Sequence, residues 1–437
     1  MKTLHLTNAY HATSGGIRTF YEALLRDAEP HGRYVRLVVP GPRDHVEDVS
    51  PYARIYTIAA PASPFVDRRY RLILPHRFLL PERGPLWKIL RDEQPDLIEV
   101  CDKYALCYLA GVLRKRSERR PVLVGLTCER MDDGLRAFAR GGRLAARFAR
   151  WYLKSVYVPQ LDVHIANSRY TASELPYNPR YPRRVYVRPM GVDTTVFTPA
   201  RRSHYRRAAL HARLGVRLGA PLLLYAGRLS GEKNVDVLPA LVERLTPLDA
   251  HLVIAGDGPS RSDLEQRTAR FRDRVHFHGH LADRTVLADL MTDADLFVHP
   301  NPREPFGIAP LEAMASGLPV VAPDRGGVTT YATAANAWLA PATAEGLGDA
   351  ALAAWGNPVE RERRRLRALD TAVAYQWPLV TGAFFDLYDD LIASRAAARS
   401  WRESRESTDE SDRRGALRGA DRPAAAWSAG PAGPAES

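Results

Sequence analysis

The chain has 437 residues, enough for two domains with complete cores, and its 62 Lys and Arg against 50 Asp and Glu give a net charge of +12. A basic protein of this kind favours phosphate-bearing ligands or an anionic membrane surface; no basic-aromatic recognition motif is visible, so nucleic acid is not an expected partner. The three cysteines show no disulfide or metal spacing, the start is no signal peptide, and no run of about 18 apolar residues occurs, which argues against secreted and membrane-spanning classes and predicts a reduced, cytoplasmic setting.

The first half of the chain alternates short apolar runs with segments of helical periodicity. Predicted strands cover residues 2–7, 34–39, 54–58, 96–100, 122–126, 162–166 and 185–188, and predicted helices cover 17–28, 87–93, 102–114 and 138–157. This alternation predicts a parallel, doubly wound sheet, a Rossmann-like domain over residues 1–190. Asn167 and Ser168 are expected to cap the helix that follows them.

Two features of this half admit both a ligand-binding and a purely structural interpretation. Gly15 and Gly16 join the first strand to a helix, which suits a phosphate, but a tight turn without a ligand would use the same glycines. The pattern of residues 138–157 predicts a basic amphipathic helix. Such a helix could lie on an anionic bilayer, or it could be an ordinary outer helix with one charged face. The basic connection at residues 68–77 could likewise meet an anionic acceptor or be a solvated loop.

The second half repeats the pattern after a turn-rich linker at residues 189–199. Predicted strands cover residues 222–226, 252–255, 275–278, 296–299 and 318–322, with helices near 234–245, 260–270 and 283–291. A second Rossmann-like domain is therefore assigned to residues 200–375, and the carboxyl ends of the two sheets are expected to border a cleft. A long final helix at residues 377–397 follows, and residues 400–437, which have few apolar positions, are predicted to be disordered.

Cations and glycines follow the predicted strands of the second half. Arg228 and Lys233 stand beside a helix start after the strand at 222–226, an arrangement suited to a diphosphate. Gly256 and Gly258 follow the next strand and would let the backbone approach a ligand closely.

Two carboxylates follow a later strand of the same half. Glu304 lies in the loop after residue 299, where it can accept hydrogen bonds from sugar hydroxyls, and Glu312 lies on the following helix, where it can hold a ribose. Between them, the backbone N–H groups of Phe306, Gly307 and Ile308 open the helix and offer an anion site.

In this order, these motifs resemble those of the retaining glycosyltransferases of family 4, which have the GT-B fold. The resemblance covers residues 1 to about 395. The matching residues are Ser14-Gly15-Gly16-Ile17, Asn167-Ser168, Pro189-Met-Gly-Val-Asp193 with Phe197 and Pro199, Gly227-Arg228-Leu with Lys233-Asn234, Gly256-Asp-Gly258-Pro259, Glu304-Pro-Phe-Gly307 and Leu311-Glu312-Ala-Met-Ala-Ser-Gly-Leu-Pro319. The resemblance implies an α/β protein of two doubly wound Rossmann-like domains that face each other across a cleft. The first would be the acceptor side, completed by the helix at 377–397, and the second would bind the nucleotide sugar.

The resemblance also implies a role for each matching residue. Arg228 and Lys233 would hold the donor pyrophosphate, Glu304 would face the donor sugar, and Glu312 would hold the ribose. The donor-binding set would be completed by Gly15, Gly16, Gly227, Gly256, Gly258, Phe306, Gly307 and Ile308. Members of this family need no cofactor beyond the nucleotide-sugar substrate and no metal, although a metal pair at Asp132 and Asp133 is an alternative.

One loop departs from the family pattern. Many members carry a histidine after the strand that matches residues 122–126, and this chain has Cys128 there, followed by Glu129 and Arg130. A thiol does not replace a protonatable imidazole well, so either the contacts of this acceptor-side loop differ or the activity is reduced.

The predicted function is retaining transfer of a hexose from a nucleotide-diphosphate sugar to a hydroxyl acceptor that is lipid-linked or a glycoconjugate. Resemblance to bacterial mannosyltransferases of the phosphatidylinositol type favours GDP-mannose, and the basic segments suit a cytoplasmic protein that is peripheral on an anionic membrane surface. Alternatives are a catalytically impaired nucleotide-sugar-binding pseudoenzyme, suggested by Cys128, and a sugar-nucleotide epimerase of the same fold. The sequence carries no signal for the oligomeric state.

Overall fold

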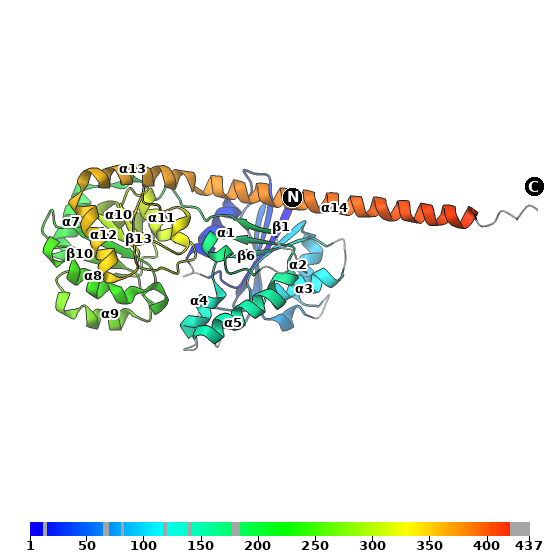
Figure 1. Ribbon diagram of the computed structural model, residues 1–437, viewed down its shortest axis with the longest axis horizontal. Helices are drawn as coiled ribbons and strands as arrows, with labels where there is room; N and C mark the ends of the chain where they lie inside the picture. The colour runs from blue at the N-terminus through cyan, green and yellow to red at the C-terminus, as the bar shows by residue number, and fades with distance from the viewer. Residues whose placement is uncertain are drawn as a thin grey trace, which may run out of the picture. The chain divides into compact units, whose positions relative to one another are not determined.

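Figure 1 shows the computed structural model, which describes residues 1–11, 15–63, 70–79, 83–116, 120–138, 142–176 and 184–419. The chain forms two compact units, Met1–Tyr388 and Asp389–Ser437. The first unit contains two separate sheets built mainly from parallel strands, and this confirms the predicted pair of doubly wound domains.

The first sheet has the strand order β3-β4-β2-β1-β5-β6-β7-β8, and only β3 runs antiparallel to its neighbour. Its strands are β1 (Lys2–Thr7), β2 (Tyr34–Gly41), β3 (His45–Asp48), β4 (Ala53–Ala59), β5 (Leu97–Cys101), β6 (Val122–Thr127), β7 (Val163–Ala166) and β8 (Arg184–Val187). The edge strand β3 is an addition to the prediction. All of its residues are exposed, so it lacks the apolar alternation by which a half-buried strand is recognised.

Helices cover both faces of this sheet. They are α1 (Gly16–Asp27), η1 (Pro75–Arg77), α2 (Pro85–Glu93), α3 (Cys107–Arg116), α4 (Met131–Phe138), α5 (Gly142–Tyr152), η2 (Leu153–Tyr157), η3 (Val158–Gln160) and α6 (Arg169–Ala172). Leu4 and Ile98 of the sheet share one apolar cluster with Leu109 of α3 and Leu153 of η2. The opposite face meets α1 and the beginning of α14 (Trp377–Gly419), where the rings of Phe20 and Phe384 lie 4.9 Å apart.

The predicted basic helix at residues 138–157 is divided differently in the structure. α4 begins at Met131, inside the expected loop, and its first turn contains Asp132 and Asp133, whose charges favour a helix N-terminus. α5 then covers Gly142–Tyr152, and the last residues form the π-helical turn η2. Residues 139–141, between α4 and α5, lie outside the described residues.

The second sheet is parallel throughout, in the order β11-β10-β9-β12-β13-β14. Its strands are β9 (Leu222–Ala226), β10 (His251–Ala255), β11 (Val275–Gly279), β12 (Leu296–Val298), β13 (Val320–Pro323) and β14 (Trp338–Ala340). The accompanying helices are η4 (Pro199–Arg201), α7 (His204–Leu214), η5 (Gly231–Lys233), η6 (Val235–Val237), α8 (Leu238–Arg244), η7 (Thr246–Leu248), α9 (Arg261–Arg267), η8 (Ala269–Phe271), α10 (Arg284–Asp293), α11 (Ile308–Ala315), η9 (Gly327–Thr330), α12 (Ala344–Gly356) and α13 (Pro358–Ala374).

The helix expected at residues 234–245 is shorter than predicted. Asn234 has a left-handed backbone (φ 56°), which a helix interior does not accept, and α8 starts only at Leu238 after two short 3-10 turns. The left-handed turn lets the Asn234 amide donate to the carbonyl of Pro300 at 2.9 Å and to that of Ala342 at 3.1 Å. Asn234 therefore ties the loop after β9 to the loop after β12.

The chain passes back to the first sheet beside the interdomain linker. Val192 of the linker forms a parallel bridge with Gln376, and a side chain at Gly191 would collide with the ring of Trp377 at 2.6 Å. α14 then continues to Gly419, so the predicted end at residue 397 is too early. The Ala, Arg and Glu residues after position 397 are good helix formers although few are apolar, which explains the error. Residues 420–437 lie outside the described residues, and disorder there stays a prediction.

Candidate active site

The loops after β9 and β10 pack backbone against backbone. Gly227 donates to the carbonyl of Ala255 at 3.0 Å, and Leu229 donates to that of Asp257 at 3.0 Å. A Cβ at Gly256 would lie 1.9 Å from the Gly227 carbonyl oxygen, so glycine is required by this contact alone. The glycines predicted to approach a donor thus have a first role in bringing the two loops together, and their contact with a ligand stays a prediction.

Lys233 and Glu304 form an ion pair at the carboxyl edge of the second sheet. The Lys233 ammonium lies 2.9 Å from Glu304 Oε2, and the Asn301 amide donates to the same oxygen at 2.9 Å. Burial alone would raise the pKa of Glu304, but Lys233, His299 and the hydrogen bonds from Lys233 and Asn301 outweigh it and hold the pKa at about 2. Glu304 is therefore an ionised acceptor at neutral pH.

The cations of the predicted diphosphate site are close together. Burial opposes protonation of Lys233, yet the Glu304 carboxylate raises its pKa above the ordinary value, while the Arg228 guanidinium is near enough to act against that rise. The Arg228 side chain is half-buried, and its carbonyl accepts from Tyr225 at 2.9 Å. Two cations, Arg228 and Lys233, thus stand near two carboxylates, Glu304 and Glu232, at this edge of the sheet.

His299 is a buried neighbour of this site that the sequence did not mark. Its Nε2 atom lies 3.9 Å from Glu304 Oε2, and burial lowers the pKa of His299 to about 4, so the imidazole is neutral at pH 7. Asn301 also escaped prediction. The signal for both was their position immediately after β12, where an α/β sheet places ligand-binding side chains.

The Glu304 loop is held through its carbonyl groups. Gly327 donates to the Glu304 carbonyl at 2.6 Å, the Tyr331 hydroxyl donates to the Gly307 carbonyl, and the Ser168 hydroxyl donates to the Pro305 carbonyl at 2.6 Å. Gly307 itself has φ 90°, a conformation suited to glycine, and α11 follows it. Among the described residues no side chain caps the N-terminus of α11, as an anion site requires.

The remaining predicted donor residues are placed as follows. Phe306 has a side chain that is only 2% exposed and contacts the Tyr331 ring at 5.2 Å, so only its backbone is available to a ligand. Glu312 lies on α11 with its side chain 4% exposed, and it accepts a hydrogen bond from Arg284 of α10. Arg284 was not predicted, because nothing in its sequence surroundings links it to α11.

The two glycines of the first domain meet this site from the other side. Gly16 begins α1, and a Cβ there would lie 2.8 Å from the Ile308 side chain at the start of α11. Gly15 precedes α1 as its N-cap residue, while Ser14 lies outside the described residues. The structure thus brings the predicted glycine loop and the predicted anion site together.

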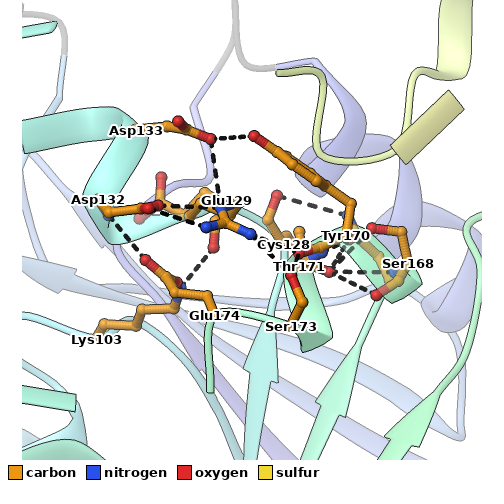
Figure 2. A network of polar contacts seen from close by, with 12 residues as sticks. Lys103, Cys128, Glu129, Asp132, Asp133, Ser168, Tyr170, Thr171, Ser173 and Glu174 are labelled. Atoms are coloured by element: carbon orange, nitrogen blue, oxygen red, sulfur yellow. Dashed lines mark hydrogen bonds and ion pairs between the residues drawn. The ribbon is translucent and has the colours of Figure 1, made fainter. Parts of the chain in front are cut away.

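Figure 2 shows the polar network around the loop that contains Cys128 and Glu129. Arg130 donates to Asp132 and Ser173 at 2.9 Å each, and its guanidinium lies 4.5 Å from the centre of the Tyr170 ring. These contacts use the Arg130 donors within the protein. An acceptor would have to displace them to reach the guanidinium.

Lys103 contacts the loop that contains Cys128 and Glu129. It is 2% exposed, donates to the Glu129 carbonyl and pairs with Glu174 at 2.8 Å. Desolvation raises the pKa of Glu129, whereas Lys103 acts in the opposite direction. Lys103 and Glu174 were missed, because they are distant in sequence from the loop that they hold.

Cys128 is the residue in place of the usual family histidine. A hydrogen bond with Cys101 and burial raise the pKa of the Cys128 thiol well above its ordinary value, so the thiol is neutral at pH 7. Asp132 and Asp133, the alternative metal pair, both contact Arg130, at 2.9 and 3.4 Å. Within the described ranges, no group of three His, Cys, Asp or Glu side chains suited to a metal occurs.

Two family descriptions match the chain. "Glycosyltransferase Family 4" matches residues 14–196, and "Glycosyl transferases group 1" matches residues 206–368. The first range covers the strands of the first sheet except β1, and the second range covers every strand of the second sheet.

Curated relatives agree with the family match. The GDP-mannose-dependent alpha-(1-6)-phosphatidylinositol dimannoside mannosyltransferase of Mycobacterium tuberculosis is 30% identical over 371 residues, 84% of this chain and 90% of that protein. The GDP-mannose-dependent alpha-mannosyltransferase of Mycolicibacterium smegmatis is 33% identical over 214 residues, 49% of this chain and 53% of that protein.

A solved structure agrees in fold. The sucrose-phosphate synthase of Thermosynechococcus elongatus superposes with a TM-score of 0.71 at 21% identity, over 90% of this chain and 99% of that one. No helix within the described residues has the length and apolarity to cross a membrane. The chain belongs to the group 1, family 4 glycosyltransferases of the GT-B fold, and it is a hexosyltransferase.

Proposed function

We propose that the chain transfers mannose from GDP-mannose, with retention of configuration, to a hydroxyl group of a lipid-linked acceptor at the cytosolic face of a membrane. The observation that carries the donor half is the Lys233–Glu304 pair beside Arg228 and the uncapped start of α11. The identities of nucleotide and sugar are supported by the two relatives whose names specify GDP-mannose. A lipid-linked acceptor is supported by the relative named for phosphatidylinositol dimannoside.

Donor binding would rearrange the ion pair. A diphosphate offers Lys233 and Arg228 more negative charge than the single carboxylate of Glu304 does. As Lys233 turns to the phosphates, Glu304 loses its strongest partner and becomes free to accept from the hydroxyls of the transferred sugar. His299, which is neutral, remains available as a donor or acceptor without adding charge.

Charge development then explains the transfer step. As the bond between the anomeric carbon and the phosphate oxygen breaks, negative charge grows on the leaving diphosphate, and Lys233, Arg228 and the N-terminus of α11 stabilise it more strongly than in the ground state. The acceptor hydroxyl attacks the same face and forms the new bond, and its proton passes to a leaving-phosphate oxygen. Neither Cys128, a neutral thiol, nor Glu312, which pairs with Arg284, is needed as a base.

A nucleotide-release assay tests this proposal. The full chain is incubated with GDP-mannose, UDP-glucose or ADP-glucose, and with phosphatidylinositol-containing vesicles as acceptor. We expect release of GDP that depends on the vesicles, and a product with the anomeric configuration of the donor by NMR. An inverted product would refute retention. GDP-mannose binding in a thermal-shift measurement, together with no nucleotide release from any donor or acceptor, would favour a binding pseudoenzyme.

A further inference from the structure

The outer face of α5 is apolar, although it is not in contact with the core. Leu144 is 74% exposed, Phe148 51% and Trp151 56%. On a helix of 3.6 residues per turn these three positions form one continuous stripe. The core contact of α5 is supplied by other residues, Ala149 and Tyr152, which are buried. The exposed stripe is therefore additional to what packing of the helix requires.

A basic stripe borders the apolar one. Arg147 and Arg150 are exposed next to Phe148 and Trp151 on the same helix. In the sequence, residues 134–161 contain six Arg and Lys and no Asp or Glu, a charge of +6 out of the chain's +12. Half of the net charge of the protein thus belongs to about one fifteenth of its length.

We propose that this face of α5, defined by Leu144, Arg147, Phe148, Arg150 and Trp151, is the surface with which the protein docks on an anionic lipid bilayer. Lipid head groups supply the negative charge for the arginines, and the acyl boundary accepts the aromatic and leucine side chains. This proposal rests on the proposed function for the location of the acceptor and adds the surface that reaches it.

Two other occupants fit the surface less well. A second copy of the chain would place one basic stripe against another, and the two would repel each other. A nucleic acid would satisfy the arginines but would leave Leu144, Phe148 and Trp151 without an apolar partner. An anionic bilayer is the partner that uses both stripes at once.

Vesicle flotation of the full chain tests the docking surface. The vesicles contain either phosphatidylcholine alone or a mixture of phosphatidylcholine with the anionic lipid phosphatidylserine. We expect binding only to the anionic vesicles, with affinity that falls as salt increases. Arg147→Gln with Arg150→Gln should weaken binding roughly 30-fold, because each neutralised charge is worth about 5-fold. Phe148→Ser with Trp151→Ser should weaken it more than about 10-fold.

A matched control lies on α7, in the other domain. Tyr205 is 87% exposed and Arg213 is also exposed, so Tyr205→Ser with Arg213→Gln removes the same kinds of side chain without touching α5. The control should bind vesicles like the wild type, and all variants should keep the thermal shift with GDP. Equal vesicle binding by the α5 variants and the control would overturn the proposal. The proposal would also be overturned if the α5 variants lost self-association or RNA binding while they kept the vesicle binding of the wild type. Vesicle binding that persists without mannosyl transfer would instead contradict only the proposed function.

A second inference comes from a hydrogen bond between the two domains. Ser168 is fully buried at the N-cap of α6, where it accepts from the Thr171 amide at 3.0 Å and donates its only proton to the Pro305 carbonyl at 2.6 Å. Pro305 lies directly after Glu304. We infer that Ser168 is a positioning residue through which the first domain sets the conformation of the Glu304 loop.

Hydrogen exchange and kinetics together test this role. Ser168→Ala should speed amide exchange at Phe306 and Ile308 and lower kcat with GDP-mannose about 2- to 10-fold, the value of one hydrogen bond. Ser168→Thr, which keeps the hydroxyl, should restore both. Thr171→Val removes the Thr171 hydroxyl, which caps α6 and lies 3.1 Å from Ser168 Oγ, but it keeps the Ser168 hydroxyl and the Pro305 carbonyl, so it should change both measurements less than Ser168→Ala does. Faster exchange in Thr171→Val equal to that in Ser168→Ala would show that only the α6 cap matters and would overturn the inference. The exchange measurement does not depend on the identity of the substrate.

Discussion

Replacing Lys233 by methionine would remove the charge but keep most of the volume of the side chain. Loss of one partner from a buried pair costs about 3–5 kcal/mol. Because the Lys233 and Glu304 side chains are still 27% and 14% exposed, we expect a loss of about 2–3 kcal/mol in the free energy of unfolding at pH 7. The pKa of Glu304, about 2 in the folded protein against about 4.3 unfolded, corresponds to about 3 kcal/mol for burial and all partners of Glu304 together, a value of the same order.

The pH dependence of this loss has a defined sign. Since folding lowers the pKa of Glu304, its stabilisation is fully present above about pH 4.3 and is lost as the pH falls through about 2. The difference in stability between wild type and Lys233→Met, measured by urea unfolding, should therefore shrink between pH 5 and pH 2. At pH 7 the same variant should lose roughly 100- to 1,000-fold in kcat, because a cation that stabilises the leaving diphosphate is gone.

Double-mutant and surface controls sharpen the test. In Lys233→Met with Glu304→Gln the losses of stability should be less than additive, because the second change removes the unpaired carboxylate. Lys88 is exposed on α2, so Lys88→Met controls for the loss of one lysine. Additive losses in the double variant, or a Lys233→Met protein as stable as Lys88→Met, would refute the reasoning.

Three further outcomes are expected. Glu312→Gln should raise KM for GDP-mannose roughly 10-fold with little change in kcat, because a ribose contact stabilises ground and transition states alike; a fall in kcat at constant KM would contradict ribose binding. Cys128 should react with iodoacetamide at pH 7.5 roughly 100-fold more slowly in the native protein than in the urea-unfolded chain, because its raised pKa leaves little thiolate. Peptide mapping measures the rate of alkylation at Cys128, and equal rates in the two states would contradict this expectation. A chain that ends at Arg399 should keep the melting temperature of the full chain, since the compact unit Met1–Tyr388 is intact in it; a large drop would show that the removed helix packs on that unit.

Local sequence rules predicted the framework of the site well. The Ser168 cap of α6, the start of α11 at Ile308 and the left-handed Gly317 after it, with φ 71°, agree with the prediction, because they depend on interactions within a few residues. Predictions failed where a local signal was weak or contradicted. The exposed strand β3 has no apolar face, and the turn at Asn234 interrupts an otherwise helical pattern.

Contacts between distant residues could not be predicted. Lys233 and Glu304 were both assigned to the donor site, but their pairing joins loops that are 71 positions apart in the chain. Arg284 and Lys103 were missed for the same reason: each reaches its partner, Glu312 or Glu174, only because neighbouring elements pack together. No pattern in a single sequence records which distant side chain fills such a position.

By itself the sequence determined the two doubly wound domains, the family, and the residues at the carboxyl ends of the second sheet, because strand and helix periodicity and the glycine and proline positions act over short distances. The tertiary structure decided how those residues are used. It placed Glu304 in an ion pair with Lys233, placed Glu312 in an ion pair with Arg284, and brought Gly16 beside Ile308. It also decided which face of α5 is buried, since an apolar periodicity shows that a helix has faces but not which of them the rest of the fold covers.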